Sequence, residues 1–181
     1  DANIVMIETL SRLYALEAAI DMALGGAQVL SAVNARGALT ALAYLMDLGT
    51  ERKALLRTLK AIAGCRLARQ LCMECRTSEA PTAEEEKAVE ALWPGTKAEK
   101  LHRPKGCPAC RDRGYRGRMS LFEVLVITDE VREALMNGAA PPAVIEIARH
   151  QGFRPFQQVA MAAILAGHTS LDEVQRVLSD L

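Results

Sequence analysis

The feature that most constrains this chain is a pair of Cys-x-x-Cys motifs separated by residues 76–106. The four cysteines are Cys72, Cys75, Cys107 and Cys110. Each motif on a tight turn presents two thiolates, and two such turns supply the four sulfur ligands of a tetrahedral zinc ion, with Zn–S bonds of about 2.3 Å. Gly106 and Pro108 favour a turn at the second motif. The spacing therefore predicts a structural zinc site with no open coordination position.

Disulfide or redox chemistry, or another metal, is the alternative use of these cysteines. Crossed disulfides need an oxidising compartment, and the opening residues DANIVMIETL have no basic segment of a secretory signal. A thioredoxin-type pair normally opens a helix after a strand, in one copy, whereas both motifs here lie in loop-forming sequence. The fifth cysteine, Cys65, lies between Gly64 and Arg66 in a stretch expected to be helical. We interpret it as a buried small residue rather than a further ligand.

The N-terminal part has the pattern of a parallel strand–helix–strand unit. Apolar runs predict strands at 4–7 (IVMI) and 28–33 (QVLSAV), and apolar residues at helical spacing predict a helix over 12–24. Further helices are expected over 37–46 and 51–70. Because a parallel pair needs more sheet around it, we expect this chain to be the C-terminal portion of a longer protein.

Beyond the first motif the sequence changes character. Residues 76–105 are expected to form an exposed insertion with one short helix at 82–92, and residues 119–127 (MSLFEVLVI) predict a strand. A small bundle of helices is expected behind that strand. Start signals for these helices occur at Thr128, at Pro141 and at the Ser170-x-x-Glu173 capping box.

The charge balance limits the classes of partner. Lys+Arg and Asp+Glu are both 22, which counts against a strongly basic nucleic-acid binder, and three Phe are few for a protein that stacks single-stranded bases. His102 and His168 have no nucleophile or carboxylate at motif spacing, so we expect both to be structural or on the surface. A local basic cluster remains a candidate site for phosphate, a carboxylate-bearing partner or RNA, or else a basic hairpin paired with acidic neighbours. Its members are Arg111, Arg113, Arg116 and Arg118.

Several segments of the chain match motifs of one known family. Residues 1–7 (DANIVMI) are similar to the Walker B strand DPDxIMVGEIRD, and residues 66–72 (RLARQLC) to QRLVRRLC. Residues 114–123 are similar to GYRGRxGIYE and residues 167–174 to GxTSLEEV. The chain thus resembles the hexameric ATPases of type II secretion and type IV pilus assembly, and the four-cysteine element is typical of their assembly and secretion branch.

The resemblance implies an α/β fold in three parts. These are the C-terminal part of a RecA-like parallel-sheet ATPase domain (1–68), a tetracysteine zinc module (69–118) and a helical C-terminal domain (119–181). It implies that the full-length protein binds ATP and Mg²⁺, forms a homo-hexamer and drives pseudopilus or pilus polymerisation. The expected partners are an inner-membrane platform protein and other subunits of the machinery, with no nucleic acid. The expected location is cytoplasmic, peripheral to the bacterial inner membrane, and the expected partner-binding residues are Arg113, Arg116 and Arg118.

The catalytic strand departs from the family pattern. The Walker B glutamate, which orients the attacking water, falls at Thr9, with Glu8 displaced by one residue onto the opposite face of a regular strand. The histidine of ALTGHL becomes Ala27, a nucleotide-sensing His-Thr-Asn becomes residues 34–36 (NAR), and no P-loop lies in this chain. Two hypotheses follow: a motor with Glu8 as its catalytic candidate, or a hydrolysis-defective paralogue acting as a zinc-stabilised structural or adaptor subunit.

Overall fold

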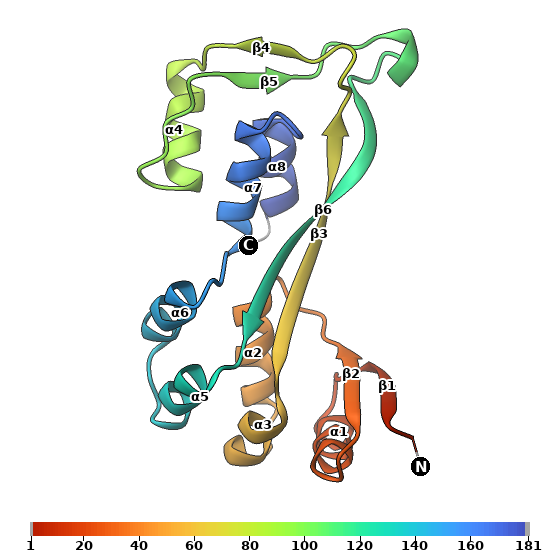
Figure 1. Ribbon diagram of the computed structural model, residues 1–181, viewed down its shortest axis with the longest axis vertical. Coiled ribbons are helices and arrows are strands. Elements are labelled where there is room, and N and C mark those ends of the chain that lie inside the picture. The colour runs from red at the N-terminus through yellow and green to blue at the C-terminus, as the bar shows by residue number, and fades with distance from the viewer. Residues whose placement is uncertain (1, 180–181) are drawn as a thin grey trace. The chain divides into compact units, whose positions relative to one another are not determined.

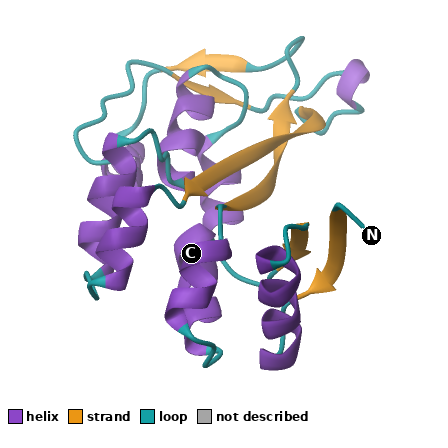
Figure 2. Cartoon of the chain, turned by 60° about the horizontal axis from the view of Figure 1, so that its bottom comes forward, coloured by secondary structure: helices purple, strands orange, loops and turns teal. Residues whose placement is uncertain are grey.

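The computed structural model describes residues 2–179, so Asp1 of the Walker B-like segment and residues 180–181 lie outside the described part. Contacts divide the chain into two compact units, Asp1–Gly64 with Val124–Phe153, and Cys65–Glu123 with Arg154–Leu181. The two longest strands of the described chain are β3 (Ala61–Leu71) and β6 (Tyr115–Val126), and they pair with each other (Figure 2). Their arrows point in opposite directions (Figure 1).

The first unit opens with the predicted parallel unit. β1 (Ile4–Thr9) pairs in parallel with β2 (Gln28–Ala32), and α1 (Leu13–Leu24) connects them. The helix ends at Gly25, and Gly26 follows with φ +98°, a backbone conformation that glycine adopts without strain. The strand–helix–strand prediction is confirmed.

Four more helices complete the first unit: α2 (Ala38–Asp47), α3 (Arg52–Thr58), α5 (Asp129–Met136) and α6 (Pro141–His150). The predicted start of α5 is confirmed, because the Thr128 hydroxyl accepts a hydrogen bond from the amide of Val131. An apolar core joins these helices to the end of β6. Its members include Leu42, Leu56, Leu125, Val131 and Val144.

The helix expected over Glu51–Gln70 is wrong beyond Thr58. Residues 61–71 form β3 instead, with side chains that alternate between exposed and less exposed positions. Cys65 accordingly lies in a strand and is exposed, not buried within a helix. The physical reason is the pairing with β6, whose residues lie far along the chain, since strand pairing with a distant segment overrides local helix propensity.

The second unit is built on the middle segment and the last two helices. β4 (Thr77–Glu79) and β5 (Leu101–Arg103) pair antiparallel, and α4 (Ala83–Leu92) lies between them in sequence, with Thr82 and Glu85 in a capping box. α7 (Phe156–Leu165) and α8 (Leu171–Leu178) contribute most of the core. The short helix at 82–92 is confirmed, but the insertion is only partly exposed, because Val89 and Leu101 are buried in this core.

The C-terminal helices divide by pairs, with α5 and α6 in the first unit and α7 and α8 in the second. The sequence expectation placed all four in one domain, 119–181, and that three-part division stays a prediction. The mixed α/β class is confirmed. Within residues 2–179 no helix is long and apolar enough to cross a bilayer.

Candidate metal centre

The four predicted cysteines come together in the second unit. Their sulfur atoms all lie within 4.8 Å of one another. The Sγ–Sγ distance is 3.9 Å for Cys72–Cys107, 3.9 Å for Cys75–Cys110 and 3.8 Å for Cys107–Cys110. A tetrahedron of sulfurs with Zn–S bonds of about 2.3 Å has edges of about 3.8 Å. The thiols thus surround one point at zinc-binding distance, and they are far outside the bonding distance of about 2.05 Å in a disulfide.

Backbone turns place these thiols. At the first motif the amides of Cys75 and Arg76 donate to the carbonyl of Cys72, at 3.3 and 3.0 Å. The second motif forms a short 3₁₀ helix, η1 (Pro108–Cys110), and then turns through Arg111 in the left-handed region, at φ 54°. Gly106 before it has φ +109°, and a Cβ there would lie 3.0 Å from the carbonyl oxygen of Asp112. The glycine and proline noted in the sequence therefore serve this turn.

Backbone amides also point at the sulfurs. The amide of Gly106 donates to Cys75 Sγ at 3.3 Å, and those of Cys107 and Gly114 donate to Cys110 Sγ at 3.3 and 3.2 Å. Burial raises the pKa of Cys110, but the amides of Cys107 and Gly114, together with the neighbouring thiols, lower that pKa to about 7. A backbone contact with Cys110 lowers the pKa of Cys107. Burial and the three neighbouring thiols together have the larger effect and raise that pKa to about 11. Four thiolates in this space therefore need a cation among them.

The donor set fits a structural metal site. The four thiols are soft sulfur donors, three of their Sγ–Sγ distances equal the edges of such a tetrahedron, and the amide donors stabilise the thiolate form that zinc binds. The cluster also closes the β3–β6 ribbon at one end, since Cys72 follows β3 directly and its amide donates to the carbonyl of Gly114, just before β6, at 2.9 Å. Cys65 is exposed on β3 and takes no part in the cluster.

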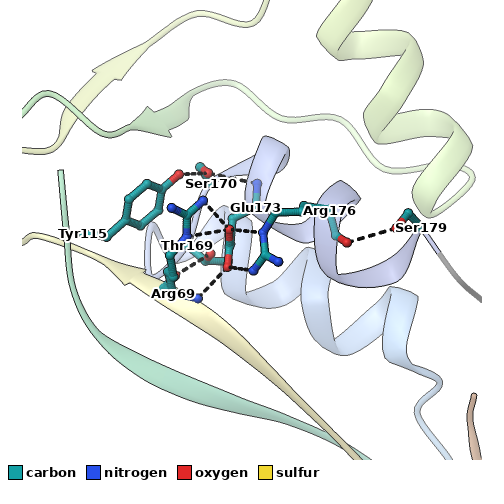
Figure 3. Close-up of polar contacts among 7 residues, drawn as sticks. All are labelled: Arg69, Tyr115, Thr169, Ser170, Glu173, Arg176 and Ser179. Atoms are coloured by element: carbon teal, nitrogen blue, oxygen red, sulfur yellow. Dashed lines mark hydrogen bonds and ion pairs between the residues drawn. The ribbon is translucent and has the colours of Figure 1, made fainter. Parts of the chain in front are cut away.

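A buried ionic network lies in the same unit (Figure 3). The side chain of Glu173, on α8, is 0% exposed. One of its oxygens accepts from Arg69 Nε at 2.8 Å and from Arg176 Nε at 3.0 Å, and the other accepts from the Arg69 amide at 2.8 Å and from Arg176 Nη2 at 2.7 Å. Burial raises the pKa of Glu173, but the two arginines lower it more, to about 2.

The network joins three of the sequence segments that resemble family motifs. The Arg69 guanidinium stacks on the ring of Tyr115 at 4.2 Å, and Tyr115 Oη lies 2.7 Å from Ser170 Oγ. Thr169 Oγ1 donates to the Arg69 carbonyl at 2.9 Å. The capping box expected at Ser170 and Glu173 is only half formed: Ser170 accepts from the Glu173 amide, while the Glu173 carboxylate binds the arginines. Sequence reasoning missed this site, because Arg176 lies three residues from Glu173 but Arg69, the partner that completes the network, lies 104 residues away and leaves no local signal.

The structure separates the arginines of the basic cluster. Arg113 donates from Nε to the Cys110 carbonyl at 3.3 Å, and Arg116 pairs with Glu74 at 3.0 Å. Arg118 lines a groove on the ribbon. The histidines are placed as expected for structural or surface residues: His102 is half-buried on β5, with a pKa lowered by burial and by nearby positive charge, and the exposed His168 accepts at its backbone carbonyl from the amide of Leu71.

The strand that carries the catalytic candidate is irregular. The pairing of β1 with β2 shifts register between Ile7 and Thr9, so Glu8 is the extra residue of a bulge. Both Glu8 and Thr9 are exposed, so the strict alternation expected across these positions does not hold. Because the strands are parallel, the end of β1 and the segment 34–36 after β2 lie at the same edge of the sheet, where ligands bind in open α/β folds.

The comparisons with known proteins decide the family. The sequence profile described as "Type II/IV secretion system protein" matches residues 1–176. This chain belongs to that family. Among curated relatives, the type II secretion system protein HxcR of Pseudomonas aeruginosa is 32% identical over 180 residues, which are 99% of this chain and 34% of that protein. The type IV pilus assembly ATPase PilB of Thermus thermophilus is 28% identical over 96% of this chain and 20% of that protein.

This family member also shares its fold with solved ATPase structures. The ATPase DotB of Legionella pneumophila superposes with a TM-score of 0.61 at 16% identity, over 99% of this chain and 39% of DotB. DotB of Yersinia pseudotuberculosis superposes with a TM-score of 0.63. The family resemblance read from the sequence motifs is confirmed. The chain spans about a third of the length of HxcR.

Proposed function

We propose that this chain is the C-terminal part of a hexameric ATPase that powers type II secretion or type IV pilus assembly. The observation that carries the proposal is the family match over residues 1–176, with relatives of both systems covering nearly all of the chain. In this function, ATP and Mg²⁺ bind mainly to residues outside this chain, and hydrolysis drives pseudopilus or pilus polymerisation.

The first unit supplies the end of the RecA-like sheet in this proposal. Its parallel β1–β2 pair, with the bulge at Glu8, would form one wall of the nucleotide site, and Glu8 would orient the attacking water in place of Thr9. The support is that Glu8 lies at the sheet edge where parallel α/β folds bind ligands. The alternative, a hydrolysis-defective structural or adaptor subunit, is favoured by Thr9 at the position of the family glutamate.

The second unit is proposed to be a zinc-stabilised module. Zinc held by Cys72, Cys75, Cys107 and Cys110 would have a structural role, because four thiolates leave no position for a substrate or water. By tying the end of β3 to the start of β6, the metal would hold the ribbon and the basic cluster rigid. The full protein would act at the cytoplasmic side of the inner membrane with a platform protein, through partner contacts that include Arg113, Arg116 and Arg118.

ATP turnover by the full-length protein tests this function. Glu8→Gln is expected to lower the steady-state rate roughly a hundredfold, since a positioned general base contributes at least that much. Glu17→Gln is a matched control, because Glu17 is an exposed carboxylate on α1, and its rate should equal that of the unmodified protein. The other possible outcome is that the unmodified protein turns over ATP only at the background rate and that the Thr9→Glu variant gains turnover. That outcome would support the adaptor alternative and exclude Glu8 as the catalytic group.

A further inference from the structure

An open groove lies on the exposed face of the β3–β6 ribbon in the second unit. Its volume is ≈ 550 Å³, and it is lined by Leu67, Arg69, Arg118 and Arg176. Leu67 and Arg69 are alternate residues of β3, Arg118 comes from β6, and Arg176 comes from α8. Three of the four lining side chains therefore carry a positive charge.

The buried carboxylate neutralises only part of this charge. Arg69 and Arg176 both bind Glu173 through Nε and Nη2, which leaves Nη1 of each guanidinium without a bond to that carboxylate. Glu173 is 0% exposed, whereas the side chains of Arg69 and Arg176 are 48% and 60% exposed. Glu173 thus holds two arginines in place, and their outer edges face the groove with one unit of excess positive charge.

Arg118 adds a second unit of charge. Within residues 2–179 no carboxylate lies within ion-pair distance of Arg118, in contrast to Arg116, which pairs with Glu74. Arg113 also has an intramolecular acceptor, the carbonyl of Cys110. Of these three arginines, Arg118 is the one whose charge is available at the groove.

Apolar surface accompanies the charge. Leu67 is 52% exposed, and Phe122, which shares a strand face with Arg118 because it lies four residues further along β6, is 53% exposed. Small-molecule sites enclose most of their ligand, and this open face does not. A face that combines exposed apolar residues with arginines matches a protein segment that carries both acidic and apolar residues.

We propose that this groove binds an acidic segment of a partner protein. Carboxylates of the segment would pair with Arg118 and with the outer edges of Arg69 and Arg176. An apolar side chain of the segment would pack on Leu67 and Phe122. This binding rests on the proposed function in one respect, which is that the basic cluster is a surface for partners of the machinery. It requires no nucleotide.

A peptide-binding measurement on the zinc-loaded full-length protein tests the proposal. The probe is a short fluorescein-labelled peptide of alternating glutamate and leucine, followed by anisotropy at low salt without nucleotide. Arg118→Glu is expected to weaken binding roughly tenfold or more, because it places a like charge against the carboxylates. Arg154→Glu reverses the same charge at an exposed position of the second unit that does not line the groove, and it should leave the affinity unchanged. Zinc content and circular dichroism show whether each variant is folded.

Several results would overturn the proposal. One is an unchanged affinity of the Arg118→Glu variant for the glutamate–leucine peptide. Another is an equal affinity of the unmodified protein for a glutamine–leucine peptide. Either result would show that binding does not depend on charge. Displacement of the peptide by inorganic phosphate would indicate a small-anion site instead. Binding of phosphatidylglycerol vesicles that depends on Arg118, without peptide binding, would assign the groove to a lipid surface. Because nucleotide is absent throughout, a failure here leaves the ATPase proposal intact, and the reverse also holds.

Discussion

Cys110→Ser in the full-length protein is expected to release the bound zinc and unfold the second unit, with a fall in melting temperature of more than about 10 °C. The reason is the position of this sulfur, which lies 3.8 Å from Cys107 Sγ and 3.9 Å from Cys75 Sγ and accepts two backbone amides. Structural zinc contributes roughly 10–16 kcal/mol to the folding of small zinc peptides. Metal analysis by atomic emission and a thermal melt measure both effects.

Cys65→Ser is the matched control for this result. Cys65 is exposed on β3 and outside the cluster, so the variant should keep about one zinc per chain and melt within about 2 °C of the unmodified protein. The zinc site would be contradicted by unmodified protein, purified under reducing conditions, that holds no stoichiometric metal. It would also be contradicted by equal melting temperatures for the two serine variants.

The second large effect is expected at Glu173. Glu173→Gln keeps the shape of the side chain but removes the charge that two arginines surround, so we expect a loss of roughly 3 kcal/mol in the free energy of unfolding. That figure corresponds to the lowering of the Glu173 pKa from its ordinary value of 4.5 to about 2. Chemical denaturation at pH 7 measures the loss.

The pH dependence has a definite sign. A carboxyl whose pKa is lowered by folding stabilises the folded state above its unfolded pKa, and this stability is lost as the pH falls towards the folded pKa. For Glu173 the window runs from about 4.5 down to about 2. The difference in stability between the unmodified protein and Glu173→Gln should therefore be constant near neutral pH and shrink through this window. Release of zinc by acid affects both proteins and cancels in the difference.

Glu74→Gln supplies the control for the ionic network. Glu74 also pairs with an arginine, but its side chain is 61% exposed, and an exposed ion pair contributes less than about 1 kcal/mol. Its substitution should leave the free energy of unfolding nearly unchanged. If Glu173→Gln proves as mild as Glu74→Gln, the buried carboxylate does not hold the arginines of the groove, and the account of that site is wrong.

The elements that the sequence predicted are those encoded by neighbouring residues. The strand, helix and strand of β1, α1 and β2 follow from apolar spacing within each segment, and the start of α5 follows from one hydroxyl at Thr128. The cysteine cluster was predictable for a related reason, since two short motifs with thiols at fixed spacing each form a turn by themselves.

The errors occurred where distant residues decide the structure. Residues 61–71 have no local feature that rules out a helix, and they become β3 because β6 pairs with them. The bulge at Glu8 depends on the register in which β1 pairs with β2, and the sequence pattern of a single strand does not show that register. The sequence pattern indicated Glu173 as one half of a capping box. In the structure its carboxylate binds Arg69, which lies 104 residues away.

Local spacing alone therefore determines the zinc-type ligand set, the parallel unit at the N-terminus and, through its motifs, the family. Tertiary structure decides what surrounds these features: which half of 51–70 is a strand, which arginines line the groove, and that a buried carboxylate holds two of those arginines. The physical reason is that turns and helices are stabilised by contacts a few residues apart. Strand pairing and buried ion pairs gain their free energy only when segments distant in sequence meet.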